Sequence, residues 1–282
     1  MKINSISAKQ ANFPPKLLDI PRPPKQLYFI GQLPDPAKPT VAIVGSRKPT
    51  AYGRSITQQI ADGLARRGVI VVSGLAFGVD AIAHQTTLEV GGQTIAVLPE
   101  DLNHIYPRSH HKLAEVIVQR GGGLVSEHQD KQYTGRWDFS PRNRLISGLA
   151  DAIVITEANA RSGSMTTAAH ALEQGRDVYA VPGPITSPLS AGCNRLIAQG
   201  ATPICDVDEF VEAIVPGRAQ QQAVFGFDDD QALIIDLIKS GIGDGDELLE
   251  KSGLSAAKFS QTMTMLEIQG SVHALGGNQW RI

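Results

Sequence analysis

The chain is poor in cysteine, in aromatic residues and in long apolar runs, and each shortage excludes a class of protein. Cys193 and Cys205 are the only cysteines among 282 residues and stand 12 positions apart (205 − 193), which fits neither a redox pair nor a zinc knuckle. We therefore expect two reduced thiols and a cytoplasmic protein. No apolar stretch approaches the roughly 18 residues that span a membrane, and residues 1–10 lack the pattern of a signal peptide.

The sequence signatures of nucleotide cofactors and of catalysis are also missing. No G-x-G-x-x-G follows the first predicted strand, and the second ends in Val72-Ser73-Gly74 without the carboxylate that would hold an NAD ribose. No G-x-x-x-x-G-K-[ST] or G-x-S-x-G occurs, and the seven histidines show no metal-ligand spacing. We expect no cofactor, no metal and no catalytic residue, although Glu157 stays open as a carboxylate that could act on a nucleotide.

The small net charge of −2 hides an uneven distribution along the chain. Residues 228–282 hold nine acidic and four basic residues, net −5, which leaves 19 acidic and 22 basic residues, net +3, in residues 1–227. A polyanion is attracted to the part of a protein with excess positive charge. The sequence therefore predicts that the first part of the chain, rather than the last, binds any polyanion.

Proline separates a lead-in from the first domain. Eight of the 17 prolines precede Val41, so residues 1–40 are expected to be extended, with a possible short strand at 27–30. Apolar runs of the kind buried on both faces of a sheet then alternate with helical periods. This pattern predicts a doubly wound, mostly parallel α/β sheet of Rossmann-like type at 41–215, with strands at 41–44, 69–72, 94–98, 123–126, 152–156 and 178–181 and helices at 53–67, 80–90, 109–119 and 165–174.

The end of the chain reads as a second, smaller domain. A Gln-rich linker is expected at 216–228, after which the pattern predicts helices at 232–239, 247–251 and 255–269 and then a β-hairpin. Three helices and a hairpin in about 55 residues are typical of a winged helix. We expect Leu275 and Trp280 to pack into its core, and residues 229–282 to form this domain.

Four clusters of polar residues follow predicted strands. Parallel strands present such loops, with their backbone N–H groups and helix N-termini, at one edge of the sheet. A glycine-rich turn with an arginine can bind phosphate, and aromatic residues interleaved with arginines can stack bases beside it. The clusters lie in segments 45–47, 73–80, 137–144 and 157–167, and the candidate residues are Gly45, Ser46, Arg47, Ser73, Gly74, Phe139, Arg142, Asn143, Arg144, Ser162, Gly163 and Ser164.

Longer motifs resemble one known family. The segments G-S-R-x-x-T-x-Y-G (45–53), S-G-L-A-x-G-V-D-x-x-A-H (73–84), F-S-P-R-N-R-L-I-S-G-L (139–149) and E-A-x-x-x-S-G-S-M-T-T-A-x-x-A (157–171) are similar to those of the DprA/Smf family, DNA-processing protein A. The similarity continues through A-V-P-G (180–183) and G-C-N-R-L-I-A-Q-G-A (192–201). It implies an extended Rossmann-like domain followed by a winged helix.

The resemblance also implies a function. Members of this family bind single-stranded DNA and help load the RecA recombinase in natural transformation, without established catalysis. By matching motif, the DNA pocket here would contain Arg47, Phe139, Arg142, Asn143, Arg144 and the loop Ser162–Ser164. The family pairs through the end of its Rossmann-like domain, so residues 194–215 are the expected homodimer face. The proline-rich residues 1–40 are too short for the N-terminal SAM-like domain of many relatives, which indicates a short form.

Two alternative functions come from other classes. Rossmann-like enzymes that hydrolyse nucleoside monophosphates carry P-G-G-x-G-T-x-x-E, whereas this chain has P-G-P-I-T-S-P at 182–188. A winged-helix repressor with a ligand-sensing domain is the other alternative, and the net charge of −5 in the last 55 residues argues against it.

Overall fold

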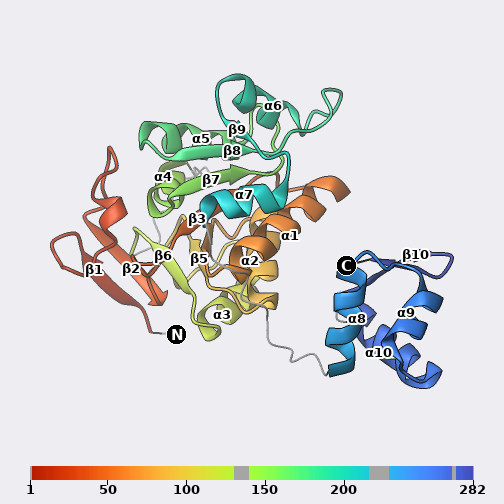
Figure 1. Ribbon diagram of the computed structural model, residues 1–282. Coiled ribbons are helices and arrows are strands. Elements are labelled where there is room, and N and C mark those ends of the chain that lie inside the picture. Colours follow the sequence, from red (N-terminus) through yellow and green to blue (C-terminus); the bar gives the residue numbers. More distant parts are fainter. Residues whose placement is uncertain (1, 130–139, 216–228, 269–270, 282) are drawn as a thin grey trace. The chain divides into compact units, whose positions relative to one another are not determined.

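The computed structural model describes residues 2–129, 140–215, 229–268 and 271–281 (Figure 1). It divides into two compact units, residues 1–223 and 224–282. The linker expected at 216–228 lies outside the described residues, as do Phe139 and the side chain of Leu275.

A mostly parallel sheet in the order β1-β2-β6-β5-β4-β3-β7-β8-β9 forms the centre of the first unit. All neighbouring strands are parallel except β1–β2 and β2–β6. From β3 the chain proceeds outward to β4 and β5, and later resumes on the other side of β3 with β7. The strands are β1 (Asn4–Ser7), β2 (Gln26–Gly31), β3 (Thr40–Val44), β4 (Ile70–Ser73), β5 (Thr94–Val97), β6 (Gly123–Ser126), β7 (Ala152–Ile155), β8 (Asp177–Ala180) and β9 (Thr202–Pro203).

Helices cover both faces of this sheet (Figure 1). On one face lie α1 (Ala51–Arg66), α2 (Val79–Glu89), α3 (His111–Gln119) and α7 (Val207–Ile214), and on the other lie α4 (Ser140–Leu149), α5 (Gly163–Glu173) and α6 (Ala191–Ala198). Alternate residues of one strand therefore enter different cores: Ile43 packs with Leu64 of α1, whereas Val44 packs with Leu145 of α4. The predicted doubly wound sheet is confirmed, since apolar runs without polar alternation are what two covered faces require.

Glycines end four helices as the sequence predicts. Gly68, Gly91, Gly121 and Gly175 all have positive φ, between 66° and 82°, and glycine adopts this backbone region without the steric cost of a Cβ. The expected elements did not include the short strands β1 and β9 or the helices α4, α6 and α7.

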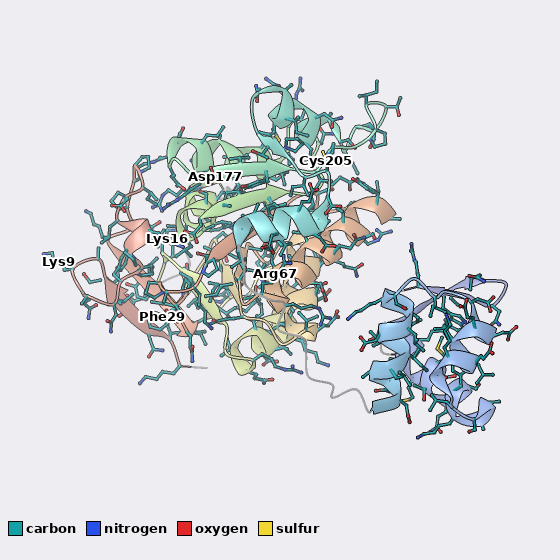
Figure 2. The ribbon with its side chains drawn as sticks, in the orientation of Figure 1. Lys9, Lys16, Phe29, Arg67, Asp177 and Cys205 are labelled. Carbon is teal, nitrogen blue, oxygen red and sulfur yellow. The ribbon has the colours of Figure 1, made fainter. Side chains whose placement is uncertain are left out.

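The proline-rich start of the chain adds to the sheet rather than only leading to it. The strand expected at 27–30 is present as β2, and β1 pairs with it at the sheet edge. Lys16, labelled in Figure 2, is the middle residue of the short helix η1 (Pro15–Leu17). Its Nζ lies 2.7 Å from the Asp151 carboxylate. This ion pair fastens the segment to the start of β7.

The second unit has the three helices and the hairpin of a winged helix, as predicted. Its elements are α8 (Asp229–Lys239), α9 (Gly245–Ser252), α10 (Ala256–Ile268), β10 (His273–Gly276) and β11 (Gln279–Arg281). Ile234, Leu248 and Leu266 are fully buried in a core of their own. Trp280 packs against this core, as expected.

Candidate functional site

A pocket of about 320 Å³ lies at the carboxyl ends of β3, β4 and β7. This is where the strand order reverses direction, and open α/β sheets bind ligands at such a point. Loops from three strands and the first turns of α4 form its wall. The lining residues are Val44, Gly45, Ser46, Arg47, Ala76, Asp80, Arg142, Asn143, Ile146, Asn159, Ser162, Gly163, Ser164, Thr167 and Leu189.

The loop that carries Arg47 is fixed by Glu157, at the end of β7. The Ser46 N–H donates to the Glu157 carbonyl oxygen at 2.6 Å. The Glu157 carboxylate, which is 3% exposed, accepts hydrogen bonds from the Thr50 N–H at 2.8 Å and the Thr50 hydroxyl at 2.7 Å. Thr50 is also the N-cap of α1 and accepts from the Gly53 N–H. Both ends of the loop are therefore anchored, and the Arg47 side chain is exposed between them.

The loop after β4 packs directly against this one. The Val79 N–H donates to the Ser46 carbonyl oxygen at 3.1 Å. Gly78 has a φ of +75°, and a Cβ there would overlap the Ser46 carbonyl oxygen. Both the backbone conformation and the close approach require glycine. The two loops thus form one rigid part of the pocket rim.

Arg142 joins the ends of two strands beneath the pocket. It is 7% exposed, and its Nη1 donates to the carbonyl oxygens of Gly74, at 2.8 Å, and of Val97. The Asp80 carboxylate accepts from the Gly74 and Ala76 N–H groups at 3.0 and 3.4 Å. Burial lowers the pKa of Arg142 to about 10, although Asp80 opposes the shift. Burial also raises the pKa of Asp80, although Arg142 opposes that shift.

Arg144 points away from this pair. Residues two apart on a helix face nearly opposite sides, and Arg144 of α4 lies against Glu127 instead of the pocket. Its Nη2 donates to both Glu127 carboxylate oxygens, at 2.8 and 2.7 Å. The two arginines of the R-N-R motif therefore have different environments, and Arg142 alone of the two lines the pocket.

The N-terminus of α5 closes the opposite wall. Ser162 is its N-cap residue, and the hydroxyl oxygens of Ser162 and Ser164 lie 2.5 Å apart. The Asn143 amide donates to the Gly163 carbonyl oxygen at 3.2 Å, which links α4 to this loop. Helix N-termini attract anions because their first N–H groups have no partner within the helix. Arg47 and the start of α5 thus both favour an anionic ligand.

Most of the residues predicted from the sequence meet in this pocket. Gly45, Ser46, Arg47, Arg142, Asn143, Ser162, Gly163 and Ser164 line it. Three predicted residues do not line the pocket. Gly74 lies beneath it and is hydrogen-bonded to Asp80 and Arg142. Ser73 is fully buried and donates to the Ile43 carbonyl oxygen at 2.6 Å, and Arg144 is paired with Glu127. Phe139 lies outside the described residues.

Several lining residues were not predicted. Ala76 and Asn159 stand within two of the clusters but carry no strong chemical signal by themselves. Leu189 lies far along the chain, in the loop before α6, and only the fold brings it to the pocket. Asp80 could have been found as a carboxylate beside a strand end, but its partner Arg142 is 62 positions away (142 − 80).

Burial favours the uncharged forms of two side chains, His84 and Cys193. Burial lowers the pKa of His84 to about 3, with His110 and Arg142 contributing. Burial raises the pKa of the Cys193 thiol to about 12. Among the described residues no group of three or more His, Cys, Asp or Glu side chains could hold a metal ion. In that same part of the chain, every helix is too short or too polar to cross a membrane.

Comparison with known proteins identifies the family. The family model described as DNA recombination-mediator protein A matches residues 4–215, and the DprA winged helix domain matches residues 218–278. Protein Smf of Escherichia coli is 37% identical over 98% of this chain and 77% of its own. DNA processing protein DprA of Bacillus subtilis is 36% identical over 79% of this chain and 75% of its own.

Two solved structures agree with this result. DprA from Streptococcus pneumoniae superposes with a TM-score of 0.69 at 36% identity and covers 76% of this chain and 74% of its own. DNA processing protein A from Helicobacter pylori superposes with a TM-score of 0.68 at 31% identity and covers 78% of this chain and 98% of its own. The chain therefore belongs to the DprA/Smf family of DNA-processing proteins.

Proposed function

We propose that this protein binds single-stranded DNA in the pocket at the carboxyl edge of the sheet. The observation that carries the proposal is the convergence of exposed Arg47 and the N-terminus of α5 on one open pocket. An arginine fork and free backbone N–H groups are both suited to a phosphate. The Helicobacter pylori relative, of which 98% is covered, is described by its single-stranded DNA binding mode, which supports the same ligand here.

The carboxylates near the pocket favour binding without catalysis. Asp80 accepts two backbone N–H groups and faces Arg142, and Glu157 accepts both polar groups of Thr50. Both carboxylates thus hold loops in place, whereas general acid–base chemistry needs a carboxylate free to exchange a proton with the substrate. A nucleoside monophosphate hydrolase remains the alternative, and base release that depends on Glu157 would favour it.

The family also suggests what the bound DNA is for. We propose that the protein protects incoming single strands in the cytoplasm and passes them to a RecA-type recombinase during natural transformation. We further propose a homodimer through residues 194–215. The two-residue strand β9, the outermost strand at that end of the sheet, lies in this segment, and edge strands are frequent sites of pairing between chains.

Titration of the full-length protein with labelled single-stranded and duplex oligonucleotides over a salt series tests the binding proposal. We expect tighter binding to the single strand, little sequence preference, and a slope of log K against log[salt] of about −0.7 for each phosphate contact. Equal affinity for duplex, or an affinity that salt does not change, would contradict the proposal. Incubation with nucleoside monophosphates in the same buffers should release no base.

A further inference from the structure

Phe77 is an exposed aromatic residue beside the pocket that no motif explains. It is 46% exposed, and it occupies the variable position of the segment S-G-L-A-x-G-V-D. Its neighbour Ala76 lines the pocket, while its own ring meets the His110 ring edge-on, with centroids 4.9 Å apart and an interplanar angle of 70°. Phe77 therefore stands on the rim, between the pocket and the segment that leads into α3.

A second hollow begins on the far side of this aromatic pair. It has a volume of about 450 Å³ and lies between α2 and α3, lined by Gln85, Leu88, Glu89, Ser109, His110, Lys112, Leu113, Val116 and Arg120. His110 is thus shared between the hollow and the contact with Phe77. Lys112 and Arg120 are exposed bases, and Glu89 is the one acid among these lining residues. The hollow combines an apolar floor with excess positive charge.

The aromatic pair is held rigidly. Leu75 is fully buried with a φ of +58°, and its carbonyl oxygen accepts a hydrogen bond from His110 Nδ1 at 2.9 Å. The residues that flank Phe77 are also fixed: the Ala76 N–H donates to Asp80, and Gly78 packs against Ser46. A ring fixed in this way loses little conformational freedom when a base stacks on it, so the entropic cost of binding is small.

We propose that Phe77 is a second base-stacking residue and that single-stranded DNA leaving the pocket crosses Phe77 and His110 into the hollow between α2 and α3. Lys112 and Arg120 would there neutralise phosphates. Base–aromatic stacking beside a positively charged groove is the usual means of binding single strands without sequence preference. This inference rests on the proposed function and adds a direction for the strand and a site beyond the pocket.

The test compares the full-length protein and its Phe77→Ala variant with a short oligonucleotide of about 4 nucleotides and a longer one of about 12, within the range of single-strand site sizes. We expect Phe77→Ala to weaken binding of the longer strand about 5-fold or more and to leave the short strand, which occupies the pocket alone, unchanged. Phe77→Tyr should retain the affinity for the longer strand, because it keeps the ring. Leu172→Ala, at an exposed apolar residue of α5, is the matched control.

Charge variants test the second part of the path. Lys112→Gln and Arg120→Gln should each flatten the salt slope for the longer strand by about 0.7 and leave the slope for the short strand unchanged. Lys9→Gln, at an exposed lysine just after β1, is the control (Figure 2). Thermal melting should be unchanged in every variant, since all of these side chains are exposed.

The outcomes separate this inference from the proposed function. If wild-type protein binds both strands but Phe77→Ala binds them as tightly, or weakens both equally, the path is wrong and the pocket stands. If the wild-type protein binds neither strand, the proposed function itself fails. The path is supported if Phe77→Ala loses affinity for the longer strand alone and Phe77→Tyr keeps that affinity.

Discussion

The first unit and the winged-helix unit belong to parts of the chain that carry net charges of opposite sign. At the sheet edge, Arg47, Lys48 and Arg161 are exposed on loops after strands. In the winged helix, Lys251 lies 2.7 Å from Glu247, and Lys258, the only base on α10, forms an ion pair with Asp230. The net charges of +3 for residues 1–227 and −5 for residues 228–282 follow the same division.

This contrast shows that a winged-helix fold does not by itself imply affinity for DNA. Winged-helix domains commonly bind duplex DNA, yet the affinity of a protein for nucleic acid depends first on how many phosphates its basic side chains neutralise. In the second unit the first turn of α9 is acidic, and α10 carries a single base, Lys258. Asp244 caps α9 and accepts from the N–H groups of Asp246 and Glu247. We therefore expect DNA affinity to reside in the first unit.

The largest effect is expected where a cation is buried rather than exposed. Arg142→Leu removes the partner of Asp80 and the donor to two strand ends, and loss of one member of a buried pair costs about 3–5 kcal/mol of unfolding free energy. Urea unfolding measures this loss. Arg144→Leu, in contact with partly exposed Glu127, should cost less, and an equal or smaller loss for Arg142→Leu would contradict the assignment.

The pH dependence of Arg142→Leu has a defined sign. Burial raises the pKa of Asp80, and Arg142 opposes that shift, so removal of Arg142 raises the pKa of Asp80 further. A carboxyl group with a raised pKa in the folded state stabilises the fold at low pH and loses this contribution as pH rises through the folded value. The loss of stability should therefore be larger at neutral than at acid pH.

Arg47→Ala should change binding rather than folding. Because the Arg47 side chain is exposed, we expect an unchanged melting temperature. A hydrogen bond to a charged group contributes roughly 1.5–3 kcal/mol, so single-strand affinity should fall about tenfold or more, and the salt slope should flatten by about 0.7. Lys48→Ala is the matched control, since Lys48 is exposed but does not line the pocket. Equal effects of the two variants would remove the special role of Arg47.

A smaller effect is expected at Asp151, away from the pocket. Burial would raise the pKa of this carboxyl, but hydrogen bonds from Lys16 and Thr40 lower it overall. A lowered pKa stabilises the fold above the unfolded value of about 3.9, and the contribution is lost as pH falls through the folded value. Asp151→Asn should cost less than about 1 kcal/mol at pH 7, because the pair is partly exposed.

Denaturant titrations across pH would check this prediction. The stabilities of wild type and Asp151→Asn should converge as pH falls below the unfolded value of about 3.9 and through the lowered folded value. Asp19→Asn, at an exposed carboxylate of the proline-rich segment that contains Lys16, is the control. A constant difference between wild type and Asp151→Asn at all pH values would show that lost packing rather than charge explains the effect.

The sheet was predictable from sequence because its strands are unbroken apolar runs. Val41–Val44 and Ala152–Ile155 are buried on both faces and could be recognised without any contact information. The strands β1 and β9 escaped recognition because β1 has one buried residue, Ile6, and β9 has two residues in all. Pro141, in the first turn of α4, is a helix-start signal that would have placed the helix correctly.

The site was predictable as a set of loops, but the environment of each side chain was not. The motif R-N-R does not show that Arg142 is buried against Gly74 and Val97 while Arg144 meets Glu127, because those partners come from other parts of the chain. Glu157 looked available for chemistry in sequence, and its role in holding Thr50 appears only once β7 and α1 are packed together.

The most direct test of the central claim is a parallel titration of full-length protein, residues 1–217 and residues 218–282 with single-stranded and duplex oligonucleotides at physiological salt. Circular dichroism confirms that each fragment is folded. We predict that residues 1–217 bind the single strand as tightly as the full chain or slightly more tightly, since an acidic unit is gone, and that residues 218–282 bind neither DNA. A folded 218–282 fragment that binds duplex, or a folded 1–217 fragment that loses most of its single-strand affinity, would contradict the account.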